Sequence, residues 1–204
     1  MKIQTPFSNV IDMCEYTRSI DFSQGLVDFT TVPIRPGGAY AIGRYLEDRP
    51  GMYTAQQYAA IADTGKSPRT IHMGLDFFAV PGTPVRSFAA GRVHDFKYRE
   101  AALDYGYTVV IEYDLAAGVH LYALFGHLGA VSLLGKVRGE PVSVGEVIGV
   151  VGDVHENGGW EVPHLHFQLS YAPPVDCDYP GVVAREDVAW ARLIYPDPAC
   201  VLGV

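Results

Sequence analysis

Two histidines lie one residue apart in the stretch VPHLHFQLS, residues 162–170. Side chains of an extended chain alternate between two faces, so His164, His166 and Gln168 share one face of a predicted strand. The apolar side chains between them share the other face. Because imidazole groups bind metals and transfer protons near neutral pH, this pattern predicts a strand with one core face and one face for chemistry.

The sequence IHMGLDFF has the same alternation, with His72, Gly74 and Asp76 on one face. The glycine has no side chain and leaves room for an ion near the backbone. Catalytic zinc usually has three protein ligands and keeps a fourth position for water. His72, Asp76 and one of His164 and His166 could supply this set, and the alternation alone does not choose between the two.

A third polar residue, His127, follows Gly126 in the apolar segment ALFGHLGAV. A lone histidine in a strand is more often structural than catalytic, but three such elements in one chain favour a common site. The other three histidines have no companion at ligand spacing, and we expect ordinary solvated or hydrogen-bonded side chains for them. They are His94, His120 and His155.

The elements that position these residues are predicted to be strands. From about residue 70 onward, alternating segments rich in β-branched and aromatic residues are separated by glycine-containing turns. The composition agrees, because 22 Gly, 14 Pro and 13 Tyr suit short strands and tight turns better than a helical bundle. We therefore predict a mainly β fold (β with minor α), with residues 69–172 as the β domain.

The regions on either side are predicted to be extensions of this domain. Residues 1–68 form an irregular N-terminal extension whose small apolar clusters predict packing on the core. Within it, residues 54–65 are the best helix candidate. Residues 173–204 form a C-terminal tail with a short helix at 184–195. The residues of this helix predicted to face inward are Trp190 and Leu193.

Charge and hydropathy exclude several classes of partner. The net charge is -8, and the 15 Lys and Arg form no basic run, so we expect no nucleic acid and no anionic membrane surface as partner. No apolar run is long enough for membrane insertion, and the first residues lack the apolar stretch of a signal peptide. A cytoplasmic location is therefore expected, unless the chain is a processed or trimmed form of an exported protein.

The order of the motifs resembles the lysostaphin and LytM-type zinc endopeptidases. HMGLD is similar to the family's HxxxD motif, GHL to its mid-chain histidine and HLHF to its HxH motif. PGTPVRSFAAGRV and GEVIGVVGD lie at the corresponding places, and the resemblance covers residues 69–170. It implies a small antiparallel β-sheet core with an open groove, and the glycine spacing of residues 135–152 adds a barrel-like meander.

The resemblance also implies residue roles and a reaction. The zinc ligands of the family fall on His72, Asp76 and His166, with one zinc ion per chain. Its two non-ligand histidines, which flank the water, fall on His127 and His164. The implied reaction is hydrolysis of peptide bonds, and the implied substrates are peptides or muropeptides that contain Gly or D-amino acids.

This sequence departs from the family pattern in two places. Phe125 and Gly126 stand where the family usually has Tyr-Ala, so a hydroxyl group beside the mid-chain histidine is missing. The loop between Gly152 and His164 is longer and more aromatic than is usual. Its Trp160 could line the groove or pack at the edge of the core.

Three other functions fit parts of the pattern. A mononuclear iron oxygenase also uses two His and one carboxylate, but with HxD rather than HxxxD spacing. A non-catalytic binding or activating module of the same fold typically lacks one or more ligands, whereas all five positions are filled here. A biotinyl or lipoyl carrier needs a lysine at a hairpin tip, and Lys136 is poorly placed for that role.

Overall fold

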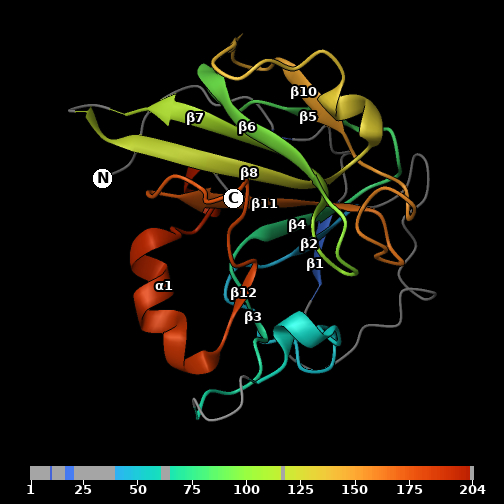
Figure 1. Ribbon diagram of the computed structural model, residues 1–204, viewed down its shortest axis with the longest axis vertical. Helices are drawn as coiled ribbons and strands as arrows, with labels where there is room; N and C mark the ends of the chain where they lie inside the picture. Colours follow the sequence, from blue (N-terminus) through green and yellow to red (C-terminus); the bar gives the residue numbers. More distant parts are fainter. Residues whose placement is uncertain (1–9, 11–16, 21–39, 61–64, 116–117, 203–204) are drawn as a thin grey trace.

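The computed structural model describes residues 10, 17–20, 40–60, 65–115 and 118–202, and strands predominate in them (Figure 1). The strands are β1 (Thr17–Ile20), β2 (Tyr40–Gly43), β3 (Ile71–His72), β4 (Leu75–Phe78), β5 (Pro84–Arg86), β6 (Gly91–Arg99), β7 (Gly106–Asp114), β8 (His120–Leu128), β9 (Pro141–Val142), β10 (Val147–Val150), β11 (His164–Ser170) and β12 (Val182–Val183). The helices are the 3-10 turns η1 (Gln56–Tyr58), η3 (Ala130–Leu133) and η4 (Arg185–Asp187) and the α-helices α1 (Val188–Ile194) and α2 (Ala199–Leu202).

One large sheet dominates the fold, with the strand order β1-β2-β4-β11-β8-β7-β6-β9. β1 pairs with β2 in parallel, and the other neighbours in this sheet are antiparallel. The meander β6-β7-β8 is continuous along the chain, and in the described residues the sheet is not closed into a barrel. The predicted mainly β fold with an antiparallel core is thus confirmed.

Apolar side chains cover both faces of this sheet. Leu165, Phe167 and Leu169 of β11 belong to the larger buried cluster, which also contains residues of the small β5-β10 sheet. On the opposite face, a second cluster includes residues of β3, β12 and α1. Figure 1 shows β5 and β10 on one side of the large sheet and α1 with β3 and β12 on the other. The predicted alternation along β11 is present, and even its polar face is buried.

The segment IHMGLDFF is not one strand, contrary to the prediction. β3 pairs with β12, whereas β4 pairs with β11 and β2. Between them, the Met73 N–H donates to the carbonyl oxygen of Gly181, and the Met73 side chain packs in the second cluster rather than with Leu75 and Phe77. Long-range pairing with two different partners therefore breaks the expected period-two pattern at Met73 and Gly74.

The helix predicted for residues 54–65 is largely wrong. The structure has only the single 3-10 turn η1 there, and residues 61–64 lie outside the described residues. The Tyr58 hydroxyl and the Gln57 amide donate to the carbonyl oxygens of Leu103 and Ala102. These contacts with a distant loop hold the segment, and the alanines beside the turn bury no common face.

The C-terminal helix is present, but with a different buried face. Its Trp190 and Leu193, predicted to face inward, are 54% and 75% exposed, whereas Ala191 and Tyr195 are buried. Ala191 lies on the buried side of α1, and Tyr195 follows the helix directly as its C-cap. No helix in the described part of the chain is long and apolar enough to cross a membrane.

Described parts of the N-terminal region contact the β domain directly. β2 pairs with β4, and Leu46 and Arg49 donate backbone hydrogen bonds to the carbonyl oxygens of His72 and Thr70. The packing of residues 1–68 as a whole stays a prediction, because residues 1–9, 11–16, 21–39 and 61–64 lie outside the described residues.

Candidate metal centre and active-site pocket

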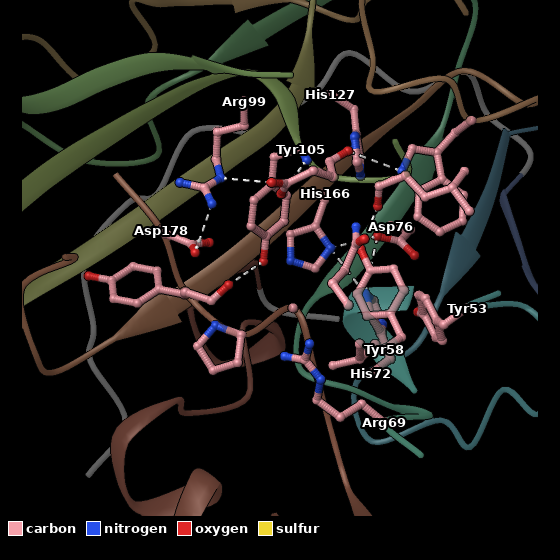
Figure 2. Close-up of a pocket in the computed structure, with 18 of the residues that line it drawn as sticks. Tyr53, Tyr58, Arg69, His72, Asp76, Arg99, Tyr105, His127, His166 and Asp178 are labelled. Atoms are coloured by element: carbon pink, nitrogen blue, oxygen red, sulfur yellow. Dashed lines mark hydrogen bonds and ion pairs between the residues drawn. The ribbon is translucent and has the colours of Figure 1, made fainter. Parts of the chain in front are cut away.

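Three predicted site residues bring their donor atoms together on the polar face of β11. His166 of β11 lies opposite Asp76 of β4 in the strand register, and His72 reaches the same point from the end of β3 (Figure 2). His72 Nε2 is 3.1 Å from His166 Nδ1 and 3.2 Å from Asp76 Oδ1. His166 Nδ1 is 3.0 Å from the same Asp76 oxygen. The three donors therefore form a nearly equilateral triangle.

The outer contacts of the two imidazoles fix their tautomers. His72 Nδ1 lies 3.0 Å from the carbonyl oxygen of Arg44, which can only accept, so Nδ1 carries the proton. Gln168 donates its amide N–H to the carbonyl oxygen of Pro180 and turns its own oxygen, 3.1 Å away, toward His166 Nε2. His166 therefore also holds its proton on the outer nitrogen. With the protons on these outer nitrogens, both inner nitrogens can act as metal donors.

The protonation states of these groups favour a cation at the centre of the triangle. Burial, followed by the charge of Arg49, lowers the pKa of His72 to about 4. Burial opposes ionisation of Asp76, but His72 and Arg49 outweigh it and hold the pKa of this carboxyl group well below its usual range. At neutral pH, an ionised Asp76 carboxylate and a neutral His72 imidazole thus converge on one point.

The spacing of the donors tests whether they fit a metal. Tetrahedral zinc with bonds of about 2.0 Å places neighbouring donors about 3.3 Å apart. The observed 3.0–3.2 Å separations are close to that value, and all three residues are buried. His72, Asp76 and His166 therefore fit a divalent cation, and His164 does not belong to this triangle.

The two remaining predicted site residues lie beside each other next to the triangle. The rings of His127 and His164 are 4.4 Å apart between centroids. Their Nδ1 atoms lie 2.8 Å from the carbonyl oxygens of Asn157 and Val162, so Nδ1 carries the proton in both. Burial lowers the pKa of both imidazoles. Two neutral histidines with unprotonated Nε2 atoms thus line the same pocket as the donor triangle.

His127 has an unusual backbone conformation. Its φ is 62°, which is uncommon for a residue with a side chain and is often found at functional sites. Its N–H donates to the carbonyl oxygen of Tyr105, and its own carbonyl oxygen accepts from the Gly152 N–H. Two backbone hydrogen bonds therefore hold the strained residue and fix the direction of its imidazole.

Tyr105 occupies the space beside the atypical Phe125-Gly126 pair. A Cβ at Gly126 would lie 2.7 Å from Tyr105 Cδ1, so the ring needs a glycine there. The Tyr105 ring packs against His127 and His166, and its hydroxyl donates to the carbonyl oxygen of Tyr179. Tyr105 could not be recognised from sequence, because nothing in the segment before β7 distinguishes it from the neighbouring tyrosines.

The pocket around these residues has a volume of about 1190 Å³. Trp160, which was predicted to line either the groove or the core edge, lines the pocket, with its ring edge-on to those of His127 and His164. Tyr53 and Tyr58 from the N-terminal region add aromatic walls. His72, His127 and His166 thus line one large pocket together with these aromatic side chains (Figure 2).

Arg49 is the other site residue that sequence analysis missed. It is 2% exposed and donates to the second oxygen of Asp76 at 2.6 Å. In the sequence it belongs to RYLEDRPG, whose charges and Pro-Gly pair are typical of a solvated turn. Only a signal that joined residue 49 to residue 76 across 27 positions could have identified it.

The histidines predicted to be ordinary lie away from this pocket. His155 is exposed, and His94 lies 3.1 Å from Glu112. His120, contrary to its expected lack of companions, faces Glu112 and Asp114 on the paired strand β7. Arg92 already bonds to both carboxylates, so this group is a solvated charge cluster on the surface.

Comparison with known proteins gives one family match and several partial relatives. The model described as Peptidase family M23 matches residues 70–177. The DD-carboxypeptidase/endopeptidase Mpg of Neisseria meningitidis and that of Neisseria gonorrhoeae are each 43% identical over 99 residues, which cover 48% of this chain and 20% of the relative. The matched part is thus about a fifth of the length of these curated relatives.

Solved structures with similar regions include two peptidases. A zinc containing peptidase from Vibrio cholerae is 27% identical with a TM-score of 0.41, covering 55% of this chain and 30% of that chain. The catalytic domain of lysostaphin from Staphylococcus simulans is 21% identical with a TM-score of 0.41, covering 65% of this chain and 85% of that chain.

Proposed function

Because this chain belongs to peptidase family M23, we propose that it is a zinc-dependent metalloendopeptidase that cleaves peptidoglycan-type peptides. The observation that carries the proposal is the convergence of three metal-donor side chains beside two neutral histidines in one pocket. The family match also confirms the resemblance read from the HMGLD, GHL and HLHF motifs.

The proposed zinc ligands are His72 Nε2, Asp76 Oδ1 and His166 Nδ1, with one ion per chain. Three protein ligands leave the fourth position for water, as in other catalytic zinc sites. When bound, zinc lowers the pKa of its water toward neutrality and polarises the scissile carbonyl group. The carbonyl oxygen of Arg44 and the amide oxygen of Gln168 would hold the two imidazoles in the orientation that zinc binding requires.

The proposed catalytic residues are His127 and His164. Each has its proton on Nδ1 and an unprotonated Nε2, so each can accept a proton from the attacking water. The proton passes to the amide nitrogen as the carbon–nitrogen bond breaks, so that the leaving group departs as a neutral amine. The backbone carbonyl groups that bind their Nδ1–H groups keep both rings in the tautomer that this transfer requires.

The proposed substrate class rests on the pocket and on the relatives. Small-molecule pockets are typically about 300–1,000 Å³, so a pocket of about 1190 Å³ has room for several peptide residues. This supports cleavage within a peptide. Because the partial relatives are DD-carboxypeptidase/endopeptidases, we propose peptides that contain D-amino acids or Gly, tested by digesting defined muropeptides and oligoglycine. A chain that holds zinc but cleaves neither would instead be a binding or activating module.

The metal assignment predicts that Asp76→Ala loses most of its zinc, since it removes the only charged donor of the triangle. Elemental analysis of the purified variant measures this directly. Asp114→Ala is the matched control, because Asp114 belongs to the exposed Glu112, Asp114 and His120 group. Zinc content unchanged in Asp76→Ala but lowered in Asp114→Ala would place the metal at the surface group and refute the assignment.

A further inference from the structure

Arg49 is buried beside the candidate metal centre and comes from outside the residues that match the family model. Its Nη1 donates to Asp76 Oδ2 at 2.6 Å and to the Tyr53 hydroxyl at 3.0 Å. Its Nε and Nη2 donate to one oxygen of Glu47 at 3.3 and 3.1 Å. A buried guanidinium is held on two sides by carboxylates, one of which is a proposed metal ligand.

Backbone pairing places Arg49 at this position. The Leu46 N–H donates to the carbonyl oxygen of His72, and the His72 N–H donates to that of Glu47. Asp48 forms a β-bridge with Ile71. The segment that carries Arg49 is thus paired with the strand that carries His72. Main-chain hydrogen bonds therefore hold the guanidinium beside the donor triangle, in addition to its own side-chain hydrogen bonds.

The two oxygens of Asp76 have different partners. Oδ1 is the oxygen in the donor triangle, at 3.2 Å from His72 Nε2 and 3.0 Å from His166 Nδ1. Oδ2 accepts from Arg49. An arginine that stood in the place of the metal would contact all three donors, but the hydrogen bond of Arg49 to Asp76 goes to the outer oxygen. Arg49 thus leaves the centre of the triangle open.

The charges favour a directional role for this contact. Glu47 pairs with Arg49 and also with the half-exposed Arg44, so its carboxylate offsets part of the positive charge that Arg49 places beside a bound cation. The planar guanidinium binds its acceptors in fixed directions, which a flexible ammonium group cannot do. A carboxylate whose second oxygen is held in this way resists rotation into a bidentate arrangement.

We propose that Arg49 is a positioning residue that holds Asp76 Oδ2 and restricts this carboxylate to binding the metal through Oδ1 alone. The proposal rests on the metal assignment of the proposed function. Its consequence concerns the fourth coordination position. A bidentate Asp76 would fill that position, whereas a monodentate Asp76 keeps it free for water.

The test replaces zinc with Co²⁺ in the full chain and compares visible absorption, Co²⁺ affinity and turnover of a muropeptide. Four-coordinate Co²⁺ absorbs more strongly in the visible range than Co²⁺ with additional ligands. Arg49→Met should therefore bind Co²⁺ with weaker visible bands. Its kcat should fall by about tenfold to a hundredfold, the usual effect of losing a contact to a metal ligand, with KM changing much less.

Arg185→Met is the matched control, because Arg185 pairs with Asp48 of the same segment, is largely exposed and does not touch Asp76. It should keep the unmodified spectrum and kcat. If Arg49→Met does not fold because Glu47 is left buried without this partner, Glu47→Gln combined with Arg49→Met removes both charges and permits the same measurement.

The outcomes separate the inference from the proposed function. An unmodified chain that binds no Co²⁺ refutes the metal assignment and the inference with it. An unmodified chain that binds Co²⁺, together with an Arg49→Met spectrum and kcat like its own, refutes only the positioning role. Tighter Co²⁺ binding and faster turnover in Arg49→Met would show that Arg49 obstructs the site, which also overturns the proposal.

Discussion

Replacing either His127 or His164 with alanine should lower the hydrolysis rate by about a hundredfold to ten-thousandfold while zinc content stays near that of the unmodified chain. Loss of a general acid or base has this effect, and neither residue belongs to the donor triangle. Both imidazoles are neutral and present an unprotonated Nε2, so each removal deletes a proton acceptor and not a ligand. The measurements are kcat with a defined muropeptide and elemental analysis of the same samples.

His155→Ala is the matched control, because His155 is an exposed histidine outside the pocket. It should change neither kcat nor zinc content. Loss of zinc from the His164 variant, with retention by a His166→Ala variant, would reverse the roles assigned to the two histidines of HLH. Full activity in both the His127 and His164 variants would refute proton transfer by these residues.

The sequence predicted the faces of β11 well, because period-two alternation is a local property of an extended chain. His164, His166 and Gln168 do share one face, and Leu165 and Phe167 pack in the core on the other. Alternation could not tell which histidine approaches the carboxylate, since that depends on the pairing of β11 with β4. In the register observed, residue 166 lies opposite residue 76.

Other features depended on partners that are distant in the sequence. Met73 does not follow the predicted alternation, because β3 and β4 pair with different strands. Arg49 is buried because its segment forms backbone hydrogen bonds with residues 70–72. A charged run beside Pro-Gly is ordinarily solvated, so only the position of Asp76 explains the burial of Arg49. The prediction that Trp190 faces inward was wrong, because the buried side of a helix depends on which of its faces packs against the rest of the fold.

The role of Gly74 was only half predicted from sequence. The glycine was expected to leave room for an ion, but the space beside it is filled by the imidazole of His166. A Cβ at residue 74 would lie 2.6 Å from His166 Cε1, 2.8 Å from His166 Nε2 and 2.8 Å from the carbonyl oxygen of Phe167. Gly74 therefore permits a close approach that sets the position of a proposed ligand.

Gly74→Ala should lower zinc affinity by about tenfold to a hundredfold or more, because the added methyl group pushes the His166 ring away from Gln168 and turns Nδ1 out of the triangle. The methyl group cannot move away from the ring instead, because the carbonyl oxygen of Phe167 lies 2.8 Å from its position. Competition with a chromophoric chelator measures the affinity. Overpacking should also cost about 1–3 kcal/mol of stability, which thermal unfolding in the presence of chelator measures separately.

Gly91→Ala separates these two effects. Its Cβ would lie 2.6 Å from the carbonyl oxygen of Glu112 and 2.8 Å from Tyr113 Cδ1, similarly close contacts that touch none of the proposed ligands. Both variants should therefore unfold at lower temperature without metal, but only Gly74→Ala should lose the stabilisation that zinc adds to the folded chain. If both variants bound zinc equally well, the added methyl group at residue 74 would not displace His166 from the metal. Gly74 would then not determine the position of this ligand.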